Sequence, residues 1–314
     1  MKETLLIMLM FWNLENYFDP FPPNEIKFWN WKKFEKKRDD IAKVIMLAKE
    51  EYSCFPAIIG VCEVENYFVL YQLTQNTPLA RIGYGIIHND SPDKRGIDVA
   101  LLYRKEIFRP IETKFFPLFS DTTKKETLKT RLILYAKGCV NNLDTLHILV
   151  NHWPSKMGGD KASLPKRMIA SNTLKKITDS ILLDNTNANI ILMGDFNDTP
   201  DSAPVLNLNK FTNLAYIYSK EHKNTGTHKY KALWSIIDQF LVNQNLYSDS
   251  TICNYSQWIY CNKNSMDIFS PPHLLTQDKT YLGYKTKRTS QGPKYLGGVS
   301  DHLPIILKLY TQTY

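Results

Sequence analysis

Acidic, amide and imidazole side chains recur in this sequence at points where short apolar runs end or begin. The stretch NIILMGDFNDTPDS, residues 189–202, carries four consecutive apolar side chains and then Asp195 and Asn197. Two other apolar runs adjoin His152, in TLHILVNHWPSKMGG, and His302, in GGVSDHLPIILKL. A charge inside or against a sheet is costly unless it is paired or bound to a metal. Repeated at several strand ends, such side chains predict one shared site.

The collected polar groups have the chemistry of a site for a hard divalent cation. Catalytic groups often gather on loops at one end of strands that a rigid scaffold holds in place. The set consists of amides, carboxylates and imidazoles from separate segments: Asn13, Glu63, Asp195, Asn197, Asp238, Asp301, His152 and His302. Magnesium and manganese prefer oxygen ligands, whereas zinc would want histidine or cysteine in the majority. We therefore expect Mg²⁺ or Mn²⁺.

The elements that position these groups are expected to form one α/β domain over residues 1–314. Short apolar runs recur from Leu5 to Leu309, and no linker, repeat or block of like charge divides them. The run from Leu5 to Trp12 lacks a small-residue cleavage site, so it predicts a first strand rather than a signal peptide. No segment approaches the length that a transmembrane helix needs.

The charge balance favours an acidic partner. Lysine and arginine total 39 against 31 acidic residues, a formal net charge of +8, which suits nucleic acid, a phosphorylated small molecule or an anionic lipid headgroup. The basic run WKKFEKKR at residues 31–38 is typical of the solvated face of a helix. The apolar stripe of that helix is expected to comprise Trp31, Phe34, Ile41, Val44 and Ala48.

The cysteines do not indicate a metal site or a disulfide framework. They are odd in number, scattered and without CxxC spacing: Cys54, Cys62, Cys139, Cys253 and Cys261. This usage is typical of a reducing compartment, and we expect a cytoplasmic, monomeric protein.

Seven short motifs in register resemble those of the endonuclease/exonuclease/phosphatase superfamily, the group of deoxyribonuclease I and the apurinic-site endonucleases. They are FWNLEN, CEVEN, RGIDVALLY, NHWPSKMGG, GDFND, IIDQFLV and SDHLP, within residues 10–309. The motif NHWPS and the GG-x-SDHLP ending are most similar to uncharacterised bacterial members. The resemblance implies a four-layered sandwich of two mixed β-sheets flanked by helices, with the site at one edge.

The resemblance also implies roles for the matched residues. Glu63 is similar to the main metal carboxylate, and Asn13 and Asp301 complete the metal site. Asp195 resembles the group that orients or deprotonates the attacking water, and Asn197 resembles a donor to the phosphate. The neighbouring Glu65 is then structural or lies on the substrate side.

Two histidines acquire partners by the same resemblance. His302 is similar to the histidine that contacts the scissile phosphate, with Asp238 accepting its other N–H and fixing its tautomer. His152 resembles a proton donor to the leaving oxygen, and Asp98 is its candidate orienting partner on the substrate side. Arg131, in KTRLILY, resembles the arginine that clamps phosphate. Two isolated histidines, His147 and His228, are interpreted as ordinary, and two acids, Asp198 and Asp201, as turn formers.

The chain departs from the family pattern in two motifs. Cys62 stands where many members have glutamine before the metal glutamate, and it is interpreted as a packing residue. The motif NHWPSKMGG differs from the histidine motif of deoxyribonuclease I, which leaves the substrate open. In this motif Ser155 and Lys156 are candidate substrate ligands, and Trp153 either stacks on a base or caps the core.

Together these patterns predict a divalent-metal-dependent phosphodiester hydrolase that cleaves a P–O bond by in-line attack of water. A nuclease, specifically an endonuclease, is the first interpretation because of the basic charge. The alternatives are a phospholipid or inositol-phosphate hydrolase and an inactive phosphate-binding module. The segment 265–300 mixes tyrosines with cations and is expected to be a functional loop region that forms a substrate wall.

Overall fold

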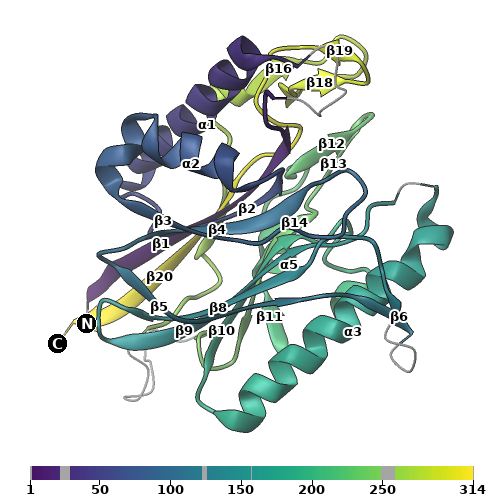
Figure 1. The fold of residues 1–314 in the computed structure, drawn as a ribbon. Helices are drawn as coiled ribbons and strands as arrows, with labels where there is room; N and C mark the ends of the chain where they lie inside the picture. The colour runs from purple at the N-terminus through teal and green to yellow at the C-terminus, as the bar shows by residue number, and fades with distance from the viewer. Residues whose placement is uncertain (1, 22–28, 122–125, 157, 249–258, 314) are drawn as a thin grey trace.

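The computed structural model describes residues 2–21, 29–121, 126–156, 158–248 and 259–313. Two six-stranded mixed sheets pack face to face, and helices lie on their outer faces (Figure 1). The expected four-layered sandwich of the deoxyribonuclease I type is confirmed.

The first sheet contains both ends of the described chain. Its strand order is β15–β20–β1–β2–β4–β3, with β1 and β2 parallel and the other neighbours antiparallel. The strands are β1 (Lys2–Tyr17), β2 (Ile58–Val64), β3 (Tyr84–His88), β4 (Asp98–Arg104), β15 (Met266–Ile268) and β20 (Ile305–Thr313). Helices α1 (Trp31–Tyr52) and α2 (Tyr67–Gln75) cover its outer face (Figure 1). The strand predicted near Leu5 is therefore confirmed as part of β1.

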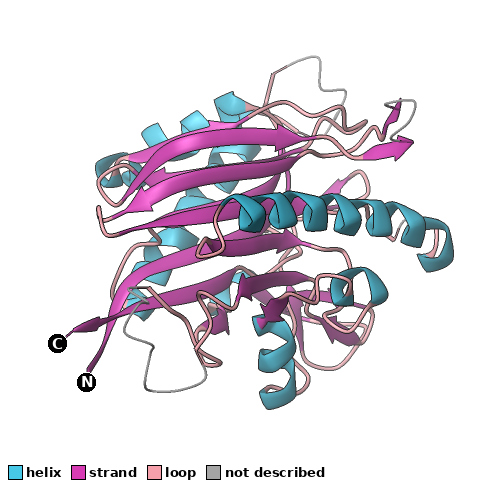
Figure 2. Ribbon diagram, turned by 90° about the horizontal axis from the view of Figure 1, so that it is seen from below, coloured by secondary structure: helices cyan, strands magenta, loops and turns pink. Residues whose placement is uncertain are grey.

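The second sheet has the strand order β11–β14–β10–β9–β8–β5, in which β9 and β10 are parallel. Its strands are β5 (Phe108–Phe116), β8 (Ile133–Val140), β9 (Asp144–His152), β10 (Asn189–Asp195), β11 (Phe211–Asn213) and β14 (Asp238–Asn243). The long helix α3 (Asp160–Asp184) crosses the outer face of this sheet (Figure 2). The helix carries the chain from the end of β9 back to the start of β10, as a parallel pair requires.

Short elements occupy the remaining connections. They are α4 (Ala203–Leu206), α5 (Leu214–Glu221), η1 (Pro78–Ile82), η2 (Pro272–Leu274), β6 (Phe119–Asp121), β7 (Glu126–Thr127), β12 (His228–Tyr230), β13 (Leu233–Ser235), β16 (Leu275–Gln277), β17 (Tyr284–Thr286), β18 (Ser290–Gln291) and β19 (Lys294–Tyr295). The expected loop region 265–300 thus contains β15 and two small hairpins. Strands of two or three residues are too short to show a period in the sequence.

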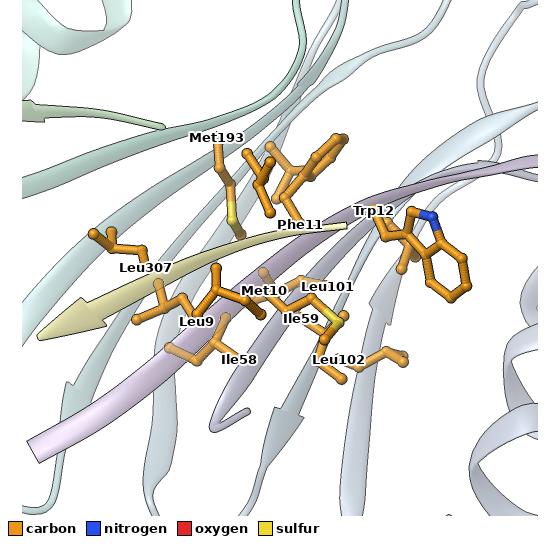
Figure 3. Close-up of a cluster of buried hydrophobic side chains, with 14 of the residues drawn as sticks. Leu9, Met10, Phe11, Trp12, Ile58, Ile59, Leu101, Leu102, Met193 and Leu307 are labelled. Carbon is orange, nitrogen blue, oxygen red and sulfur yellow. The ribbon is translucent and has the colours of Figure 1, made fainter. Parts of the chain in front are cut away.

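The interior between the sheets is apolar and closely packed. Figure 3 shows Leu9, Met10 and Phe11 of β1 together with Met193, which comes from the second sheet. A Cβ atom at Gly60 of β2 would lie 2.8 Å from Met193 Cε, so the missing side chain makes room for this contact. Truncating a fully buried leucine in such a core costs about 2–5 kcal/mol.

Helix α1 differs in part from its predicted face. Phe34 and Ile41 are buried as expected, but Lys37 is only 1% exposed, although it belongs to the run predicted to be solvated. Lys37 lies three residues after Phe34 and four before Ile41, so it shares their stripe. Its ammonium group can be buried because the carbonyl oxygen of Glu15 and the hydroxyl of Thr289 accept its hydrogen bonds. The interpretation of the run as a solvated face is therefore wrong at Lys37.

Four cysteines are free within the described ranges: Cys54, Cys62, Cys139 and Cys261. Cys62 is fully buried in the core, and Cys253 lies outside the described residues. No helix in the described part of the chain is long and apolar enough to cross a membrane.

Candidate active site

Three strand ends of the second sheet bring ionisable side chains into one row. β14 begins at Asp238, β10 ends at Asp195 and β9 ends at His152. The register pairs Asp195 with Asp238 on one side and with His152 on the other. Paired residues of neighbouring strands point to the same face of a sheet. We call these three residues the strand-end row.

His302 reaches the strand-end row from the first sheet, just before β20. Its Nδ1 lies 2.7 Å from Asp238 Oδ2, so the contact predicted between them is present, and its Nε2 lies 3.9 Å from Asp195 Oδ2. Burial by itself lowers the pKa of His302, but the carboxylates of Asp238, Asp195 and Asp301 outweigh burial and hold the pKa well above its ordinary value. The imidazole is therefore protonated at neutral pH.

Asp195 occupies the centre of the row and is almost completely buried. Its Oδ2 accepts a hydrogen bond from Asn13 Nδ2 at 3.0 Å, and its Oδ1 accepts one from the main-chain N–H of Asn197 at 2.8 Å. Burial first, and then the neighbouring Asp238, raise the pKa of Asp195 to about 7. A carboxyl group with such a pKa exchanges protons near neutral pH, as a general base must.

His152 lies on the opposite side of Asp195 and has the opposite charge state from His302. Its Nε2 is 3.7 Å from Asp195 Oδ2 and 3.8 Å from Glu63 Oε1. Burial, followed by the nearby Arg131, holds the pKa of His152 well below its ordinary value, so the ring is neutral. Its buried Nδ1 has no hydrogen-bond partner among the residues that the structure describes.

Asp98 is not the partner that fixes His152. Its Oδ2 lies 3.0 Å from His88 Nε2, and its Oδ1 accepts a hydrogen bond from the main-chain N–H of Ser91 at 2.8 Å. Strand β3 pairs with β4 and brings His88 next to Asp98, so the expected orienting contact is replaced by one across the first sheet. A role for Asp98 toward the substrate stays a prediction.

Glu63, one residue before the end of β2, has a left-handed backbone conformation, with φ at 58°. Such a conformation costs a residue other than glycine on the order of 1–3 kcal/mol and is often found at functional sites. The register between β2 and β4 shifts at this residue. Its Oε2 accepts a hydrogen bond from the main-chain N–H of Asn16 at 2.9 Å, and its Oε1 lies 3.4 Å from Arg95 Nη2. The irregularity thus directs the carboxylate toward His152.

Asp301 belongs to an ion-pair network that the sequence analysis did not identify. Its Oδ2 lies 2.9 Å from Arg288 Nη2, and Arg288 Nε lies 3.1 Å from Oε1 of the buried Glu15. Lys37 donates hydrogen bonds to the carbonyl oxygen of Glu15 and, at 2.7 Å, to Thr289 Oγ1. Glu15 stands two residues after Asn13 in the motif FWNLEN. This proximity to a predicted metal ligand is the feature of the sequence that could have indicated a place in the site.

Burial also shifts the pKa values of Glu15 and Lys37. It raises the pKa of Glu15 to about 7, with Asp301 adding to the rise, and it lowers the pKa of Lys37 to about 8. Glu15, Lys37 and Arg288 therefore surround Asp301 with groups of both signs. The pKa of Asp301 lies below its ordinary value because His302 and then Arg288 outweigh the effect of its burial.

His228 lies beside the site, so its interpretation as an ordinary isolated histidine is wrong. Its ring centroid is 4.9 Å from that of His302, and its Nε2 is 3.9 Å from Asp301 Oδ2. The main chains of the two histidines also form an isolated β-bridge. Nothing in the sequence around His228 predicts this contact, because it depends on the hairpin β12–β13. By contrast, His147 contacts the Tyr135 hydroxyl, 3.0 Å away, in the second sheet.

Trp153 fits the core-capping interpretation. Its indole is 1% exposed and meets Phe196 edge to face with ring centroids 4.7 Å apart, so it is not available to stack on a base. Its carbonyl oxygen accepts hydrogen bonds from Arg131 Nη2 at 2.5 Å and from Asn197 Nδ2 at 2.9 Å. Arg131 also pairs with Asp93 at 3.0 Å. Both predicted phosphate ligands, Arg131 and Asn197, therefore hold the loop after β9 in this structure.

The rest of that loop is held by two ion pairs of the buried Asp198. Lys156 Nζ lies 2.8 Å from Asp198 Oδ1, and Arg167 Nε, on α3, lies 2.8 Å from Asp198 Oδ2. Asp198 is thus more than the turn former that was expected, whereas Asp201 accepts a local hydrogen bond from Thr199. Ser155 is partly exposed beside Lys156.

The carboxylates present fit a hard divalent cation. Glu63 forms an ion pair with Arg95, and Asp301 forms one with Arg288. Both arginines are partly exposed to solvent. An arginine exposed to solvent can move aside and leave oxygen ligands of the kind that Mg²⁺ and Mn²⁺ prefer. The amide oxygen of Asn13 accepts the main-chain N–H of Glu15 at 2.9 Å, so Asn13 has a structural bond as well.

Comparison with known proteins agrees with this chemistry. Residues 9–311 match the Endonuclease/Exonuclease/phosphatase family, and no curated protein sequence matches significantly. An endonuclease/exonuclease/phosphatase family protein from Bacteroides thetaiotaomicron has a TM-score of 0.62 and 14% identity, with 100% of both chains covered. TDP2 from D. rerio, complexed with single strand DNA product, has a TM-score of 0.56 and 13% identity over 96% of this chain and 98% of that one.

The human Nocturnin catalytic domain, with a bound sulfate anion, has a TM-score of 0.58 and 15% identity over 99% of this chain and 97% of that one. At these identities the structural likeness shows a shared fold. The family match covers nearly the whole chain. At its strand ends, Glu63 lies 3.8 Å from His152, and Asp195 lies within 3.9 Å of both His152 and His302. The chain therefore belongs to the endonuclease/exonuclease/phosphatase family and is a metal-dependent hydrolase of phosphoric esters.

Proposed function

We propose that this protein is a nuclease, specifically an endonuclease, that hydrolyses a phosphodiester by in-line attack of water. The carrying observation is geometric: Asp238 Oδ2 holds His302 Nδ1 at 2.7 Å, and His302 Nε2 lies 3.9 Å from Oδ2 of the buried Asp195. One group can accept a proton near neutral pH while its neighbour presents a positive charge to a phosphoryl oxygen. Both are features of phosphoryl transfer.

The protein side chains divide the work by their charge. Asp195 orients the attacking water and takes its proton. His302 stabilises the negative charge that develops on the phosphoryl oxygens, and Asp238 keeps its imidazole oriented and charged. Burial and Arg131 lower the pKa of His152 and favour its neutral form, which still carries one N–H. Its role as the donor of a proton to the leaving oxygen stays a prediction.

A divalent cation, Mg²⁺ or Mn²⁺, would be held by Glu63 and Asp301, with Asn13 nearby. When bound, it supplies Lewis-acid polarisation of the phosphoryl oxygens. Arg95 and Arg288, which neutralise these carboxylates in the structure, would then be free to contact phosphate.

Nucleic acid is the favoured substrate class because the chain has a net charge of +8. The similarity to a TDP2 complexed with single strand DNA product supports the same class. A lipid surface is the second candidate. Leu282, in the turn between β16 and β17, is 98% exposed, and Leu233, the first residue of β13, is 74% exposed. Cytoplasmic location and a monomeric state stay predictions.

A substrate panel tests the proposal. Bis-p-nitrophenyl phosphate, circular and linear DNA, RNA, phosphatidylcholine and inositol phosphates are incubated with the protein and Mg²⁺ or Mn²⁺. We expect turnover of polynucleotides, with circular single-stranded DNA opened because the enzyme needs no free end. Asp195→Asn serves as the matched inactive variant. Metal binding by calorimetry without hydrolysis of any phosphodiester would instead indicate a phosphate-binding module.

A further inference from the structure

Two basic clefts lie at opposite ends of the strand-end row. In the second sheet the order β14–β10–β9–β8 places Asp238 at one end and Arg131, two residues before β8, at the other. In Figure 1 the hairpin β12–β13 lies above these strand ends and β6 lies below them, while α3 begins to their right. A chain that crosses the row would therefore meet both clefts.

The hairpin cleft is formed by β12 and the turn after it, by the hairpin β16–β17 and by the segment leading to Asp301, and it has a volume of about 500 Å³. It opens directly on His228 and Asp301. Five cations against two carboxylates line it: Lys229, Lys231, Lys285, Lys287, Arg288, Asp278 and Asp301. Tyr230 and Tyr281 also line the cleft and are 68% and 37% exposed.

Lys229 fixes the shape of the hairpin cleft. Its side chain is only 2% exposed, and its Nζ lies 3.2 Å from Asp278 Oδ2. The same atom donates hydrogen bonds to the carbonyl oxygens of Leu282 at 3.1 Å and Tyr284 at 3.2 Å. One buried ammonium group therefore joins hairpins β12–β13 and β16–β17. The adjacent His228 bridges to His302, so the cleft wall is tied to the catalytic residues.

The loop cleft at the other end has a volume of about 520 Å³ and is also basic. Its charged lining consists of four cations and one carboxylate: Lys94, Lys129, Arg131, Lys166 and Glu126. Pro154 and Ser155, from the loop after His152, form the side nearest the row. Among the residues that the structure describes, no tyrosine or tryptophan lines the loop cleft, and its cations suit phosphates.

We propose that the substrate is an unpaired nucleic acid strand that continues on both sides of the scissile phosphate, with a base in the hairpin cleft and backbone phosphates in the loop cleft. The proposal rests on the proposed nuclease function and specifies its substrate. Aromatic rings among cations are the usual platform for single strands. A cleft of about 500 Å³ admits a guest of small-molecule size, which suits one nucleotide unit and excludes a duplex.

Binding without metal tests the proposal independently of turnover. Fluorescence anisotropy in EDTA compares a labelled single-stranded oligodeoxynucleotide with the same sequence as a blunt duplex. We expect the single strand to bind at least about tenfold more tightly, and affinity to rise with length until both clefts are filled. If oligonucleotides bind in this way and no hydrolysis occurs with metal, the substrate inference stands and the nuclease function fails.

Variants of Tyr281 test whether a base of the single strand stacks in the hairpin cleft. Tyr281→Ala should weaken binding of the single strand about 5- to 100-fold, the range for loss of one stacked base, whereas Tyr281→Phe should retain it. Tyr71→Ala on α2 and Lys105→Ala in the turn after β4 are exposed controls far from the clefts. Both controls should bind as the wild type does.

Lys229 is tested as a positioning residue through the split between KM and kcat. Lys229→Met should raise KM for the single strand at least about tenfold while lowering kcat much less, because the substrate wall loosens but the strand-end row does not. Lys229→Arg should restore much of the loss, since it can still bridge to Asp278. A proportional fall of kcat in both variants would overturn the assigned role.

Other results would overturn the substrate assignment. One is equal affinity for duplex and single strand, and another is wild-type affinity of Tyr281→Ala for the single strand. A third is tighter binding of inositol hexakisphosphate than of the single strand. Sedimentation of the protein with phosphatidylcholine vesicles that contain phosphatidylserine, lost on Leu282→Ser, would also assign the exposed hairpin tips to a lipid surface.

Discussion

At the residue scale, two histidines of one site hold opposite charge states for physical reasons that the structure makes plain. His302 faces three carboxylates and is held protonated, whereas His152 is buried beside Arg131 and is held neutral. Between them, the carboxyl group of Asp195 titrates near pH 7. The site therefore contains a proton acceptor and a fixed positive charge at neutral pH.

Replacing His302 by alanine should reduce kcat at least about 10²-fold, the size expected when a positioned charge partner of the transition state is removed. Asp238→Asn should lose less, because the ring stays in place although its charged form is weakened. Rates are measured on bis-p-nitrophenyl phosphate and on a single-stranded oligonucleotide. Wild-type rates in both folded variants would show that this pair has no part in the reaction.

Glu63→Gln keeps the shape of the side chain and removes its charge. We expect this variant to stay folded but to bind Mg²⁺ or Mn²⁺ much more weakly and to lose nearly all hydrolysis. Calorimetry measures the first effect and a rate assay the second. Glu65→Gln, two residues away and bonded to the main chain of Asp19, is the matched control. Undiminished metal affinity together with undiminished turnover would remove Glu63 from the site.

At the scale of elements, the position of Asp195 depends on how closely β9 and β10 approach. A Cβ atom at Gly194 would lie 2.3 Å from the main-chain oxygen of Asn151 on β9. The glycine that breaks the apolar run NIILMG is therefore a requirement of strand packing, placed immediately before the central carboxylate. A change there should move the strand end and the side chain that it carries.

Gly194→Ala should lower the free energy of unfolding by about 1–3 kcal/mol, as overpacking does, and should reduce activity further because Asp195 shifts. Gly60→Ala is the matched control in the other sheet, where the added Cβ meets the flexible end of Met193 instead of a main chain. Urea unfolding and the rate assay compare the two. Equal losses in both variants would contradict the special role of the β9–β10 approach.

The interior of β9 also carries a pH dependence of stability that is separate from the active site. Burial, and then Lys137, lower the pKa of His147 to about 4. A group with a depressed folded pKa contributes stability above its unfolded pKa, near 6.5, and that contribution is lost as the pH falls toward about 4. His147→Phe should therefore lose less stability than the wild type between pH 7 and pH 4.5. Parallel pH profiles in metal-free urea unfolding would contradict this.

At the scale of the whole molecule, the site exists because the two sheets face each other. The first sheet contributes Asn13, Glu63, Asp301 and His302, and the second contributes the strand-end row. Basic clefts continue from the row on both sides. The net charge of +8 is thus concentrated in part where a polyanionic chain would run.

Affinity for a single strand should fall steeply as salt rises, because each phosphate that a lysine or arginine neutralises releases counterions. The slope of log K against log salt is about −0.7 for each such contact on a single strand. Lys287→Ala should make the slope shallower by about 0.7, the value of one phosphate contact, and Lys105→Ala should leave the slope unchanged. A flat response for DNA and RNA would move the substrate class to lipids or small phosphoesters.

The sequence by itself determined the strands that carry the site and most of its chemistry. Apolar runs that stop at Asp195, Glu63 and His152 are local signals, because a buried charge needs a partner wherever it occurs. The motif resemblance added the pair His302 and Asp238, which are 64 residues apart and contact each other in the structure.

Only the tertiary structure decided which groups meet and which charge each one holds. Lys37 was predicted to be solvated because its run is basic, yet it is buried and donates a hydrogen bond to the main chain of Glu15. His228 was interpreted as isolated, but the hairpin β12–β13 places it beside His302. The stripe of α1 places Lys37 on the buried side, but its partner Glu15 lies on another element. The contact of His228 depends on a hairpin of three-residue strands, which are too short to show a period in the sequence. Protonation depends in turn on burial and on neighbours from both sheets, so it exists only once the two sheets have packed together.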